Sequence, residues 1–371
     1  MVNSELQDVR SHEAQRTAQG LVELAVRGLP QMLDQRAGMF CYKMKKAAAG
    51  LVREGLSPRY TAMTLMGLHR LEQSGPPAAF DVQPVLEGLL SNTNWVENIG
   101  DAGLMLWLAA QVAPDRLGEL ASRLQIQTAM SRFADAREGT TMNLAWFLTG
   151  LSYYAQVSDD GKKLGGIARE TYNLLIANQG KFGYFSHQAS RGSVKGVVRG
   201  HIGSFADQVY PIYGMTQFFQ AFGEESALRR AQQCASAICE AQGPLGQWWW
   251  HYDSRSGSVF EEYPVFSVHQ HGMGPMTLFA LGKASGTNFD PWIYKGIDWI
   301  DRRNELSVNM EDGSANVIWR CIGQTKLKRF ASALLGASRK IQNPERGLSI
   351  LYECRPYELG WLLYGLAGLL H

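Results

Sequence analysis

The feature that most constrains this chain is a repeated pair of helical segments, in which an amphipathic segment alternates with one that is apolar on nearly every side. The segments of the second kind are rich in small and aromatic residues, and they span 57–71, 100–113, 140–157, 204–223, 267–286 and 355–371. A helix that is apolar all round must be buried all round. Six such helices with six amphipathic partners predict an inner ring sheathed by an outer ring, which is an all-α (α/α)6 barrel.

The amphipathic partners are expected between the inner segments, at 39–53, 82–90, 116–137, 162–178, 224–241 and 289–303. In the third of them, apolar residues recur three and four positions apart at Leu117, Leu120 and Leu124, as one face of a helix requires. The spacing between successive inner segments grows along the chain, which fits one helical hairpin per repeat with insertions.

The whole chain of 371 residues is predicted to form one domain, because the helical pairs are evenly distributed and no Pro/Ser/Gly-rich linker separates them. Residues 1–38 are expected to form an N-terminal helical extension, and residues 304–354 an insertion before the last inner helix. Strand-like alternation at 315–322 and 348–354 predicts a small β-hairpin inside that insertion.

Bulk properties exclude several classes of protein. A net charge of +2 without a basic stripe argues against nucleic-acid binding. No uninterrupted apolar run of ~18 residues predicts a membrane-spanning helix, and the polar start of the chain lacks the pattern of a secretory signal. Five cysteines without CxxC spacing suit reduced thiols, so a cytoplasmic location is expected. Neither a DDxxD cluster nor a Cys/His ligand set is present, so no metal and no cofactor is expected.

Aromatic residues are abundant, with 10 Trp, 14 Tyr and 15 Phe, and many lie on the inner segments or on the turns that lead into them. A closed ring of helices leaves a central cavity whose wall consists of such side chains. Most aromatic residues simply fill a core, but the consecutive Trp248, Trp249 and Trp250 cannot all point into one core. The residues expected to bind substrate are Tyr60, Trp107, Trp146, Tyr210, Tyr213, Trp248, Trp250, Tyr263, Tyr357 and Arg355.

A short motif follows two of the predicted outer helices. Residues 242–248 read QxxxGxW, and residues 179–185 read QxxxGxF at the same place in the preceding repeat. The Gln can cap helix carbonyls, the Gly permits a tight turn, and the aromatic ring can stack on the Gln amide. The pattern resembles the QW repeat of squalene–hopene cyclases and of the related toroids of terpenoid cyclases and protein prenyltransferase β subunits. The resemblance implies an α/α barrel and, by association, isoprenoid chemistry.

The chain departs from these families where their chemistry lies. It has no DxDD motif of class II cyclases, no prenyltransferase zinc set and no Cys-His pair of lanthionine cyclases. Three interpretations therefore stay open: a divergent cyclase with a different acid, a sugar-active toroid, and a non-catalytic relative.

Polar residues at the starts of the inner segments are expected to converge at one end of the cavity. Asp101 and Asp207 rank first as proton donors. The alternative role of Asp101 is to stabilise the N-terminus of its own helix, and that of Asp207 is to hydrogen-bond to a neighbouring loop amide. His269 and His271 would diverge by about 200° on a helix, so they suit acid, base or orienting roles better than joint metal binding. The catalytic candidates are Asp101, Asp207, His201, His269, His271 and Glu358. Glu358 could instead close the ring through a salt bridge.

The main interpretation is a protonation-initiated isoprenoid or meroterpenoid cyclase, in which aromatic faces stabilise the migrating cation. The alternative is a carbohydrate-active enzyme of a bacterial glycan pathway, such as a glycoside hydrolase, uronyl lyase or epimerase. A non-catalytic binding toroid is the third interpretation. An apolar wall with a lone acid would favour the cyclase, whereas several paired charges would favour the sugar enzyme. The expected partner is thus a small hydrophobic or glycan substrate, and both membrane-surface contact and the oligomeric state stay open.

Overall fold

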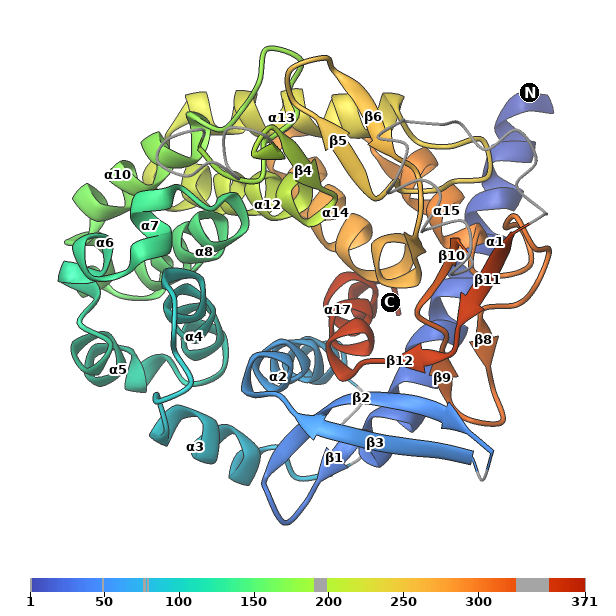
Figure 1. Ribbon diagram of the computed structural model, residues 1–371, viewed down its shortest axis with the longest axis horizontal. Helices are drawn as coiled ribbons and strands as arrows, with labels where there is room; N and C mark the ends of the chain where they lie inside the picture. Colours follow the sequence, from blue (N-terminus) through green and yellow to red (C-terminus); the bar gives the residue numbers. More distant parts are fainter. Residues whose placement is uncertain are drawn as a thin grey trace.

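The computed structural model of the protein describes residues 2–48, 50–75, 78, 80–189, 199–324 and 347–370, without the side chains of 2–14 and 137. Its helices form two concentric rings (Figure 1), as the sequence predicts. The inner ring consists of α2 (Pro58–Gln73), α4 (Ile99–Val112), α8 (Thr141–Val157), α12 (Ala206–Phe222), α14 (Gly274–Ser285) and α17 (Pro356–Leu366). The outer ring consists of α1 (Val2–Gly28), α3 (Gln83–Ser91), α5 (Leu117–Arg123), α10 (Gly165–Ile176), α13 (Glu225–Glu240) and α15 (Asp290–Asp298). The prediction of an (α/α)6 barrel is confirmed.

Smaller elements connect the two rings. The short helices are α6 (Ala129–Arg132), α7 (Ala134–Glu138) and α9 (Asp159–Lys162). The 3-10 turns are η1 (Leu29–Met32), η2 (Pro114–Arg116), η3 (Ile126–Thr128) and η5 (Ala367–Leu369), and η4 (His269–Met273) is a π-helical turn that runs into α14. No described helix is both long enough and apolar enough to cross a membrane.

The inner helices are buried on all sides, as their sequences require. In α4 every residue from Ile99 to Ala110 is buried. Glycines let the inner helices approach closely: a Cβ placed on Gly150 of α8 would lie 2.2 Å from the carbonyl oxygen of Gly103 in α4. Because larger residues there would push the helices apart, these small residues set the diameter of the ring.

Two of the predicted outer helices are wrong in detail. Residues 39–53 form a β-hairpin instead of a helix, because Phe40 and Met44 are buried below the strand while Gly50 and Gly55 hold positive φ angles that end helices. Residues 116–137 break into short helices, since Gln125, two residues after the end of α5, has a left-handed backbone (φ 51°).

The outer helix of the last repeat comes from the start of the chain. Helix α1 packs against α17 and α15, so the segment 1–38, expected as an extension, supplies the sixth outer helix. The insertion 304–354 contains the predicted hairpin: β10 pairs antiparallel with β11, with Cys321 opposite Leu351. Residues 325–346 of that insertion lie outside the described residues.

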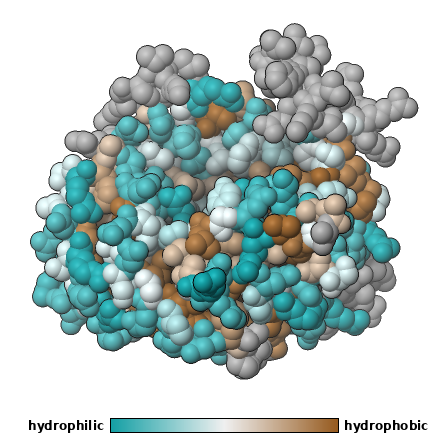
Figure 2. All heavy atoms as spheres, turned by 60° about the horizontal axis from the view of Figure 1, so that its bottom comes forward, coloured by the Kyte–Doolittle hydropathy of each residue, from teal (hydrophilic) through white to brown (hydrophobic). Residues whose placement is uncertain are grey.

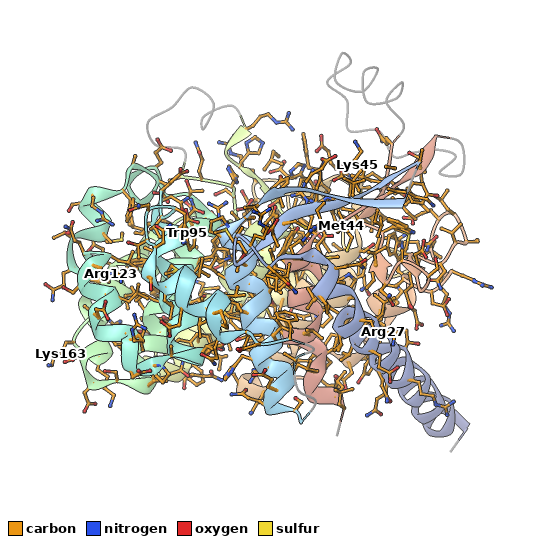
Figure 3. The ribbon with its side chains drawn as sticks, turned by 90° about the horizontal axis from the view of Figure 1, so that it is seen from below. Arg27, Met44, Lys45, Trp95, Arg123 and Lys163 are labelled. Carbon is orange, nitrogen blue, oxygen red and sulfur yellow. The ribbon has the colours of Figure 1, made fainter. Side chains whose placement is uncertain are left out.

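Short sheets lie above one end of the ring (Figure 3). The strands are β1 (Leu33–Asp34), β2 (Met39–Ala47), β3 (Gly50–Leu56), β4 (Ile202–Ser204), β5 (His251–Asp253), β6 (Ser258–Glu261), β7 (Val265–Phe266), β8 (Glu311–Asp312), β9 (Val317–Ile318), β10 (Cys321–Gln324), β11 (Leu348–Leu351) and β12 (Glu353–Cys354). Their sheet orders are β1-β2-β12 with β3 on β2, β11-β10-β7, β4-β5-β6 and β8-β9. Strands β3, β4, β7 and β12 lead directly into α2, α12, η4 and α17. We call this end, formed by the first turns of the inner helices and these strands, the N-terminal rim.

Aromatic side chains fill the ring interior below the N-terminal rim, toward the C-terminal ends of the inner helices. Trp107 stacks on Tyr213 and Trp361, with ring centroids 5.1 and 5.3 Å apart. The hydroxyls of Tyr153, Tyr213 and Tyr364 form a closed hydrogen-bonded triangle, with oxygen–oxygen distances of 2.6, 2.9 and 3.2 Å. We call these five residues the aromatic plug. The charged side chains described below lie at the opposite end of the ring, at the N-terminal rim.

Candidate functional site

A buried carboxylate opens helix α4 at the rim. Asp101 is 1% exposed and accepts hydrogen bonds from the Arg59 Nε at 2.8 Å and the Asn98 Nδ2 at 2.8 Å. Asn98 is also the N-cap of α4, because its Oδ1 accepts the backbone N–H of Asp101 at 2.9 Å. The Arg59 side chain keeps 38% exposure and lies over the ring of Trp146. Asp101 thus fixes an arginine whose outer part faces solvent.

A second carboxylate, at the start of α12, holds a histidine. The Asp207 Oδ2 accepts the Ser204 backbone N–H and the Ser204 Oγ, both at 2.9 Å, and lies 3.1 Å from the His187 Nδ1. Asp207 is 1% exposed, whereas the His187 side chain is 53% exposed. Hydrogen bonding to Asp207, together with its negative charge, raises the pKa of His187. Among the described residues, the hydrogen-bond partner found for this imidazole is Asp207, which bonds its Nδ1.

A second histidine–carboxylate pair lies on the neighbouring sheet. His251 on β5 sits directly opposite Ser204 on β4, and its Nδ1 is 2.5 Å from the Glu261 Oε2 on β6. The hydrogen bond with His251 lowers the pKa of Glu261, so that carboxylate stays ionised. Trp250 packs on His251 at a centroid distance of 4.6 Å. The pairs His187–Asp207 and His251–Glu261 are therefore side by side on the rim.

Glu358 forms a buried ion pair with Arg320, which lies in the insertion before α17, so this pair does not join the last repeat to the first. The Glu358 Oε1 accepts the Arg320 Nη1 at 2.5 Å, and its Oε2 accepts the backbone N–H of Arg355, the N-cap of α17, at 2.9 Å. Burial raises the pKa of Glu358, although the Arg320 charge opposes that shift. Both side chains of the ion pair are nearly inaccessible, at 11% and 3% exposure.

Three tyrosines form a stack that runs from the hairpin into the rim. The ring of Tyr42 on β2 is stacked on Tyr60 (5.4 Å between centroids, 16° between planes), and Tyr60 contacts Tyr357 at 4.5 Å. The Arg355 Nη1 donates to the Tyr60 hydroxyl at 2.6 Å, and its guanidinium lies 4.5 Å from the centroid of Tyr42. Burial raises the pKa of both Tyr60 and Tyr357, so both keep their protons at neutral pH. We call Tyr42, Tyr60 and Tyr357 the tyrosine stack.

Two more of the expected residues line the ring interior below the rim. Trp146 packs edge-on against Tyr210, whose hydroxyl accepts the Trp361 Nε1 at 2.9 Å. Trp146 and Tyr210 are buried, at 3% exposure each. They lie between the charged pairs of the rim and the aromatic plug.

His269 and His271 lie in one buried turn, where His269 packs on Trp250 at a centroid distance of 6.1 Å, and His201 lies elsewhere. His269 is 3% exposed, between Phe205 and Phe266, and His271 is fully buried in the same π-helical turn. Burial lowers the pKa of both imidazoles to about 3. His201 lies before β4, where its backbone carbonyl accepts the hydroxyl and the amide of Ser254.

The remaining aromatic candidates are packed against other parts of the protein. Trp107 and Tyr213 belong to the aromatic plug, Trp248 is fully buried against Phe205, and Tyr263 donates its hydroxyl to Glu305. The structure thus brings together these predicted residues at the rim: Asp101, Asp207, Glu358, Tyr60, Trp250, Arg355 and Tyr357.

The catalytic and binding candidates from the sequence omit five residues of the rim: Arg59, His187, His251, Glu261 and Arg320. A signal for His187 was available, because a histidine follows both copies of the short motif, at 187 after QxxxGxF and at 251 after QxxxGxW. Arg320 carries no local signal, since it lies in the insertion far in sequence from Glu358. Among the described residues, no group of three or more His, Cys, Asp or Glu could hold a metal ion. Metal-independent action stays a prediction.

Comparison of the sequence with models of protein families and with curated proteins gives no match. Solved structures do match. The unsaturated glucuronyl hydrolase of Bacillus sp. GL1 superposes with a TM-score of 0.62 at 15% identity, over 96% of this chain and 97% of that chain. A family 88 glycosyl hydrolase from Bacteroides vulgatus gives 0.61 at 11% identity, over 94% and 98%. A Streptococcus agalactiae unsaturated glucuronyl hydrolase variant, complexed with dGlcA-GalNAc6S, gives 0.58 at 11%, over 95% and 91%. These likenesses establish the fold.

The predicted kinship with terpenoid cyclases is wrong. The matching structures are (α/α)6 enzymes of carbohydrate metabolism, and they match over nearly the whole chain rather than over one motif. The QxxxGxW and QxxxGxF segments are local devices of the ring: the Gln242 amide donates to the Gly246 and Trp292 carbonyls, and the Gln179 amide to those of Gly183 and Arg230. Each Gln thus ties its turn to the next outer helix, which any α/α ring can use. The cyclase interpretation, with its isoprenoid substrate, is withdrawn.

Proposed function

We propose that this protein is a glycoside hydrolase that acts on a glycan with an acidic sugar residue. The observation that carries the proposal is the set of paired charges at the N-terminal rim: Arg59–Asp101, His187–Asp207, His251–Glu261 and Arg320–Glu358. A hydrocarbon could not replace the water that such groups lose on binding, whereas a sugar supplies hydroxyls and a carboxylate that hydrogen-bond to them. The likeness in fold to glucuronyl hydrolases supports the same conclusion by analogy.

In this proposal the two histidine–carboxylate pairs divide acid and base roles. His187, whose pKa Asp207 raises, donates a proton to the glycosidic oxygen as the carbon–oxygen bond breaks. His251, oriented through its Nδ1 by the ionised Glu261, accepts a proton from the attacking water. Arg59, held by Asp101 but 38% exposed, is placed to bind the carboxylate of the sugar.

The test is incubation with a panel of glycans, read by mass spectrometry and by loss of the ultraviolet absorbance of unsaturated uronates. The acidic probes are dGlcA-GalNAc6S and dGlcA-Glc-Rha-Glc, which the neighbouring enzymes bind in their structures, and neutral oligosaccharides of equal length are the comparison. We expect cleavage of an acidic probe only. Cleavage confined to neutral probes, or no cleavage of any probe, would reject the proposal.

Single substitutions then test the roles. His187→Gln and His251→Gln should each lower kcat by about 10²- to 10⁴-fold, since general acid or base catalysis is lost. His69→Gln is the matched control, because His69 lies near the opposite end of α2, where its ring hydrogen-bonds Gln73. Activity of both rim variants equal to that of the control would show that these histidines do not take part in the reaction.

A further inference from the structure

The carboxylates of the rim share one arrangement, in which each holds a polar side chain that comes from another element. Asp101 holds Arg59 in this way, and Asp207 holds His187. Helix α8 lies between α4 and α12 in the inner ring (Figure 1), yet the ion pairs described above include no residue of α8. Viewed obliquely from the side of the β2–β3 hairpin, the surface mixes hydrophilic and hydrophobic residues (Figure 2), so the contacts of individual side chains, rather than a surface patch, identify groups that can bind a sugar.

A further carboxylate, Asp135 on α7, holds a side chain at the start of α8. The Asp135 Oδ2 accepts the Asn143 Nδ2 at 3.0 Å, and both Asp135 oxygens lie 3.2 Å from the backbone nitrogen of Ile99, the first residue of α4. Because an ionised carboxylate only accepts hydrogen bonds, the amide of Asn143 must turn its nitrogen toward Asp135 and its Oδ1 away. The orientation of the Asn143 side chain is therefore fixed.

The oxygen of this amide lies beside the Arg59–Asp101 pair. Asn143 packs on Gly100, the residue before Asp101, since a Cβ placed on Gly100 would lie 2.8 Å from the Asn143 Oδ1. Trp146, one turn further along the same face of α8, lies under the guanidinium of Arg59 at 5.8 Å. Asn143 is half-buried, and its Oδ1 accepts no hydrogen bond from a described residue, yet it keeps contact with solvent. A ligand held by Arg59 can thus meet an oriented acceptor.

We propose that Asn143 determines which acidic sugar binds, because its Oδ1 accepts a hydrogen bond from a hydroxyl of the sugar whose carboxylate lies at Arg59. Asp135 is a positioning residue that keeps this oxygen turned toward the sugar. The inference rests on the proposed glycan substrate and adds that the acidic sugar needs a free hydroxyl. A site built to bind a hydroxyl discriminates against an analogue that lacks it, so a sugar that is methylated or sulfated at this hydroxyl should bind weakly.

The test is a cycle that removes the hydroxyl and the amide separately. Isothermal titration calorimetry on the inactive His187→Gln background uses the methyl glycoside of dGlcA and its 2-deoxy and 3-deoxy forms as probes. One deoxy form should bind about 3- to 10-fold more weakly than the parent glycoside, as expected for loss of one hydrogen bond. In Asn143→Ala the parent should bind about 3- to 10-fold more weakly, and this ratio of deoxy form to parent should fall to about 1.

Two more variants test the placement of the amide. Asn143→Ser, with a residue that suits the first turn of a helix but is too short to reach the ligand, should give the same ratio of about 1. Asp135→Asn should also lower the ratio, because an amide at 135 can turn its own NH2 toward Asn143 and draw the Oδ1 away from the sugar. An unchanged ratio in Asp135→Asn would reject the positioning role.

Asn173→Ala is the matched control, because Asn173 is exposed on the outer helix α10, and it should keep the ratio of the unsubstituted chain. A ratio that survives in both Asn143 variants, or equal binding of the parent and both deoxy forms by the unsubstituted chain, would overturn the role of Asn143 alone. No binding of the parent would overturn this role and the glycan substrate together. The expected ratios without cleavage of any glycan would leave the role of Asn143 standing and reject only the hydrolase.

Discussion

One carboxylate oxygen of Asp207 accepts three hydrogen bonds, and this arrangement shows that Asp207 and its partner His187 have different roles. A buried acid that accepts bonds from Ser204 and His187 is an orienting group, whereas the more exposed His187 is the group that can meet a substrate. The residue found from sequence is thus the neighbour of the residue that we assign to proton transfer. The same holds for Asp101, which positions Arg59.

Asp207→Asn should change the pH dependence of the reaction. The amide keeps the size of the side chain but removes the negative charge that raises the pKa of His187, so this pKa falls. Since His187 must be protonated to act as the acid, the alkaline limb of the kcat/KM profile should move to lower pH, and kcat at neutral pH should fall by about 10²-fold or more. Profiles of wild type and variant measure the shift. Asp159→Asn, on the exposed α9, is the control, and an alkaline limb that stays in place in Asp207→Asn would count against the assignment.

The sequence could predict which residues face the ring interior but not their depth along its axis. Asp101, Asp207 and Glu358 were found because a helix start has its own sequence signals. Trp107 and Tyr213 are equally buried, yet they lie in the aromatic plug. A helix that is apolar on all sides does not indicate how far along the ring axis each of its residues lies. Charge partners such as Arg320 come from segments far apart in the chain, so no local pattern indicates them.

At the level of elements, the prediction worked where a helix is buried on all sides and failed where a segment is half exposed. All six inner helices are confirmed to within a few residues. The segment 39–53 was mistaken for a helix because its Lys and Ala residues favour helices, whereas the pairing of β2 with β3 and β12 decides the outcome. In Figure 3, Met44 and Lys45 lie at this strand; Met44 is buried and Lys45 exposed, as strand alternation requires.

Gly246→Ala should destabilise the ring at the turn of the QxxxGxW segment. Gly246 has φ +96°, and a Cβ would lie 2.0 Å from the Lys295 carbonyl oxygen in α15. Overpacking and backbone strain together should lower the free energy of unfolding by about 2–4 kcal/mol, measured by urea denaturation. Gly286→Ala is the control, because Gly286 has φ +72° but a Cβ placed on it would have no atom within 4 Å. This variant should lower the free energy of unfolding by only about 1 kcal/mol. Equal losses at the two sites would show that close packing of the turn on α15 does not matter.

For the whole molecule, two buried imidazoles make stability depend on pH. Burial lowers the pKa of His269 and His271 to about 3, against about 6.5 when unfolded. Because the unfolded chain binds these protons first, stability is complete above the unfolded pKa and falls as pH drops from 6.5 toward 3. Lowering the pH from 7 to 5 should therefore reduce the free energy of unfolding by about 2 kcal/mol for each of these histidines.

His271→Leu isolates this contribution. Neither ring nitrogen of His271 has a hydrogen-bond partner among the described residues, so an apolar side chain of similar size should be tolerated at pH 7. The loss of stability between pH 7 and pH 5, measured by urea unfolding, should be about 2 kcal/mol smaller than in wild type. An identical loss in the two proteins would mean that the folded and unfolded chains protonate His271 equally, so that burial does not lower its pKa.

Helix α1 is the outer partner of α17, so the first and last helices of the ring meet. During synthesis α1 emerges long before α17, and until then its apolar face and the two open ends of the growing arc have no partner. Closing contacts at such a long sequence separation carries a large entropic cost and is slow. The nascent chain therefore passes through a long open-arc stage with exposed apolar surface, at which chaperones can bind and neighbouring chains can associate.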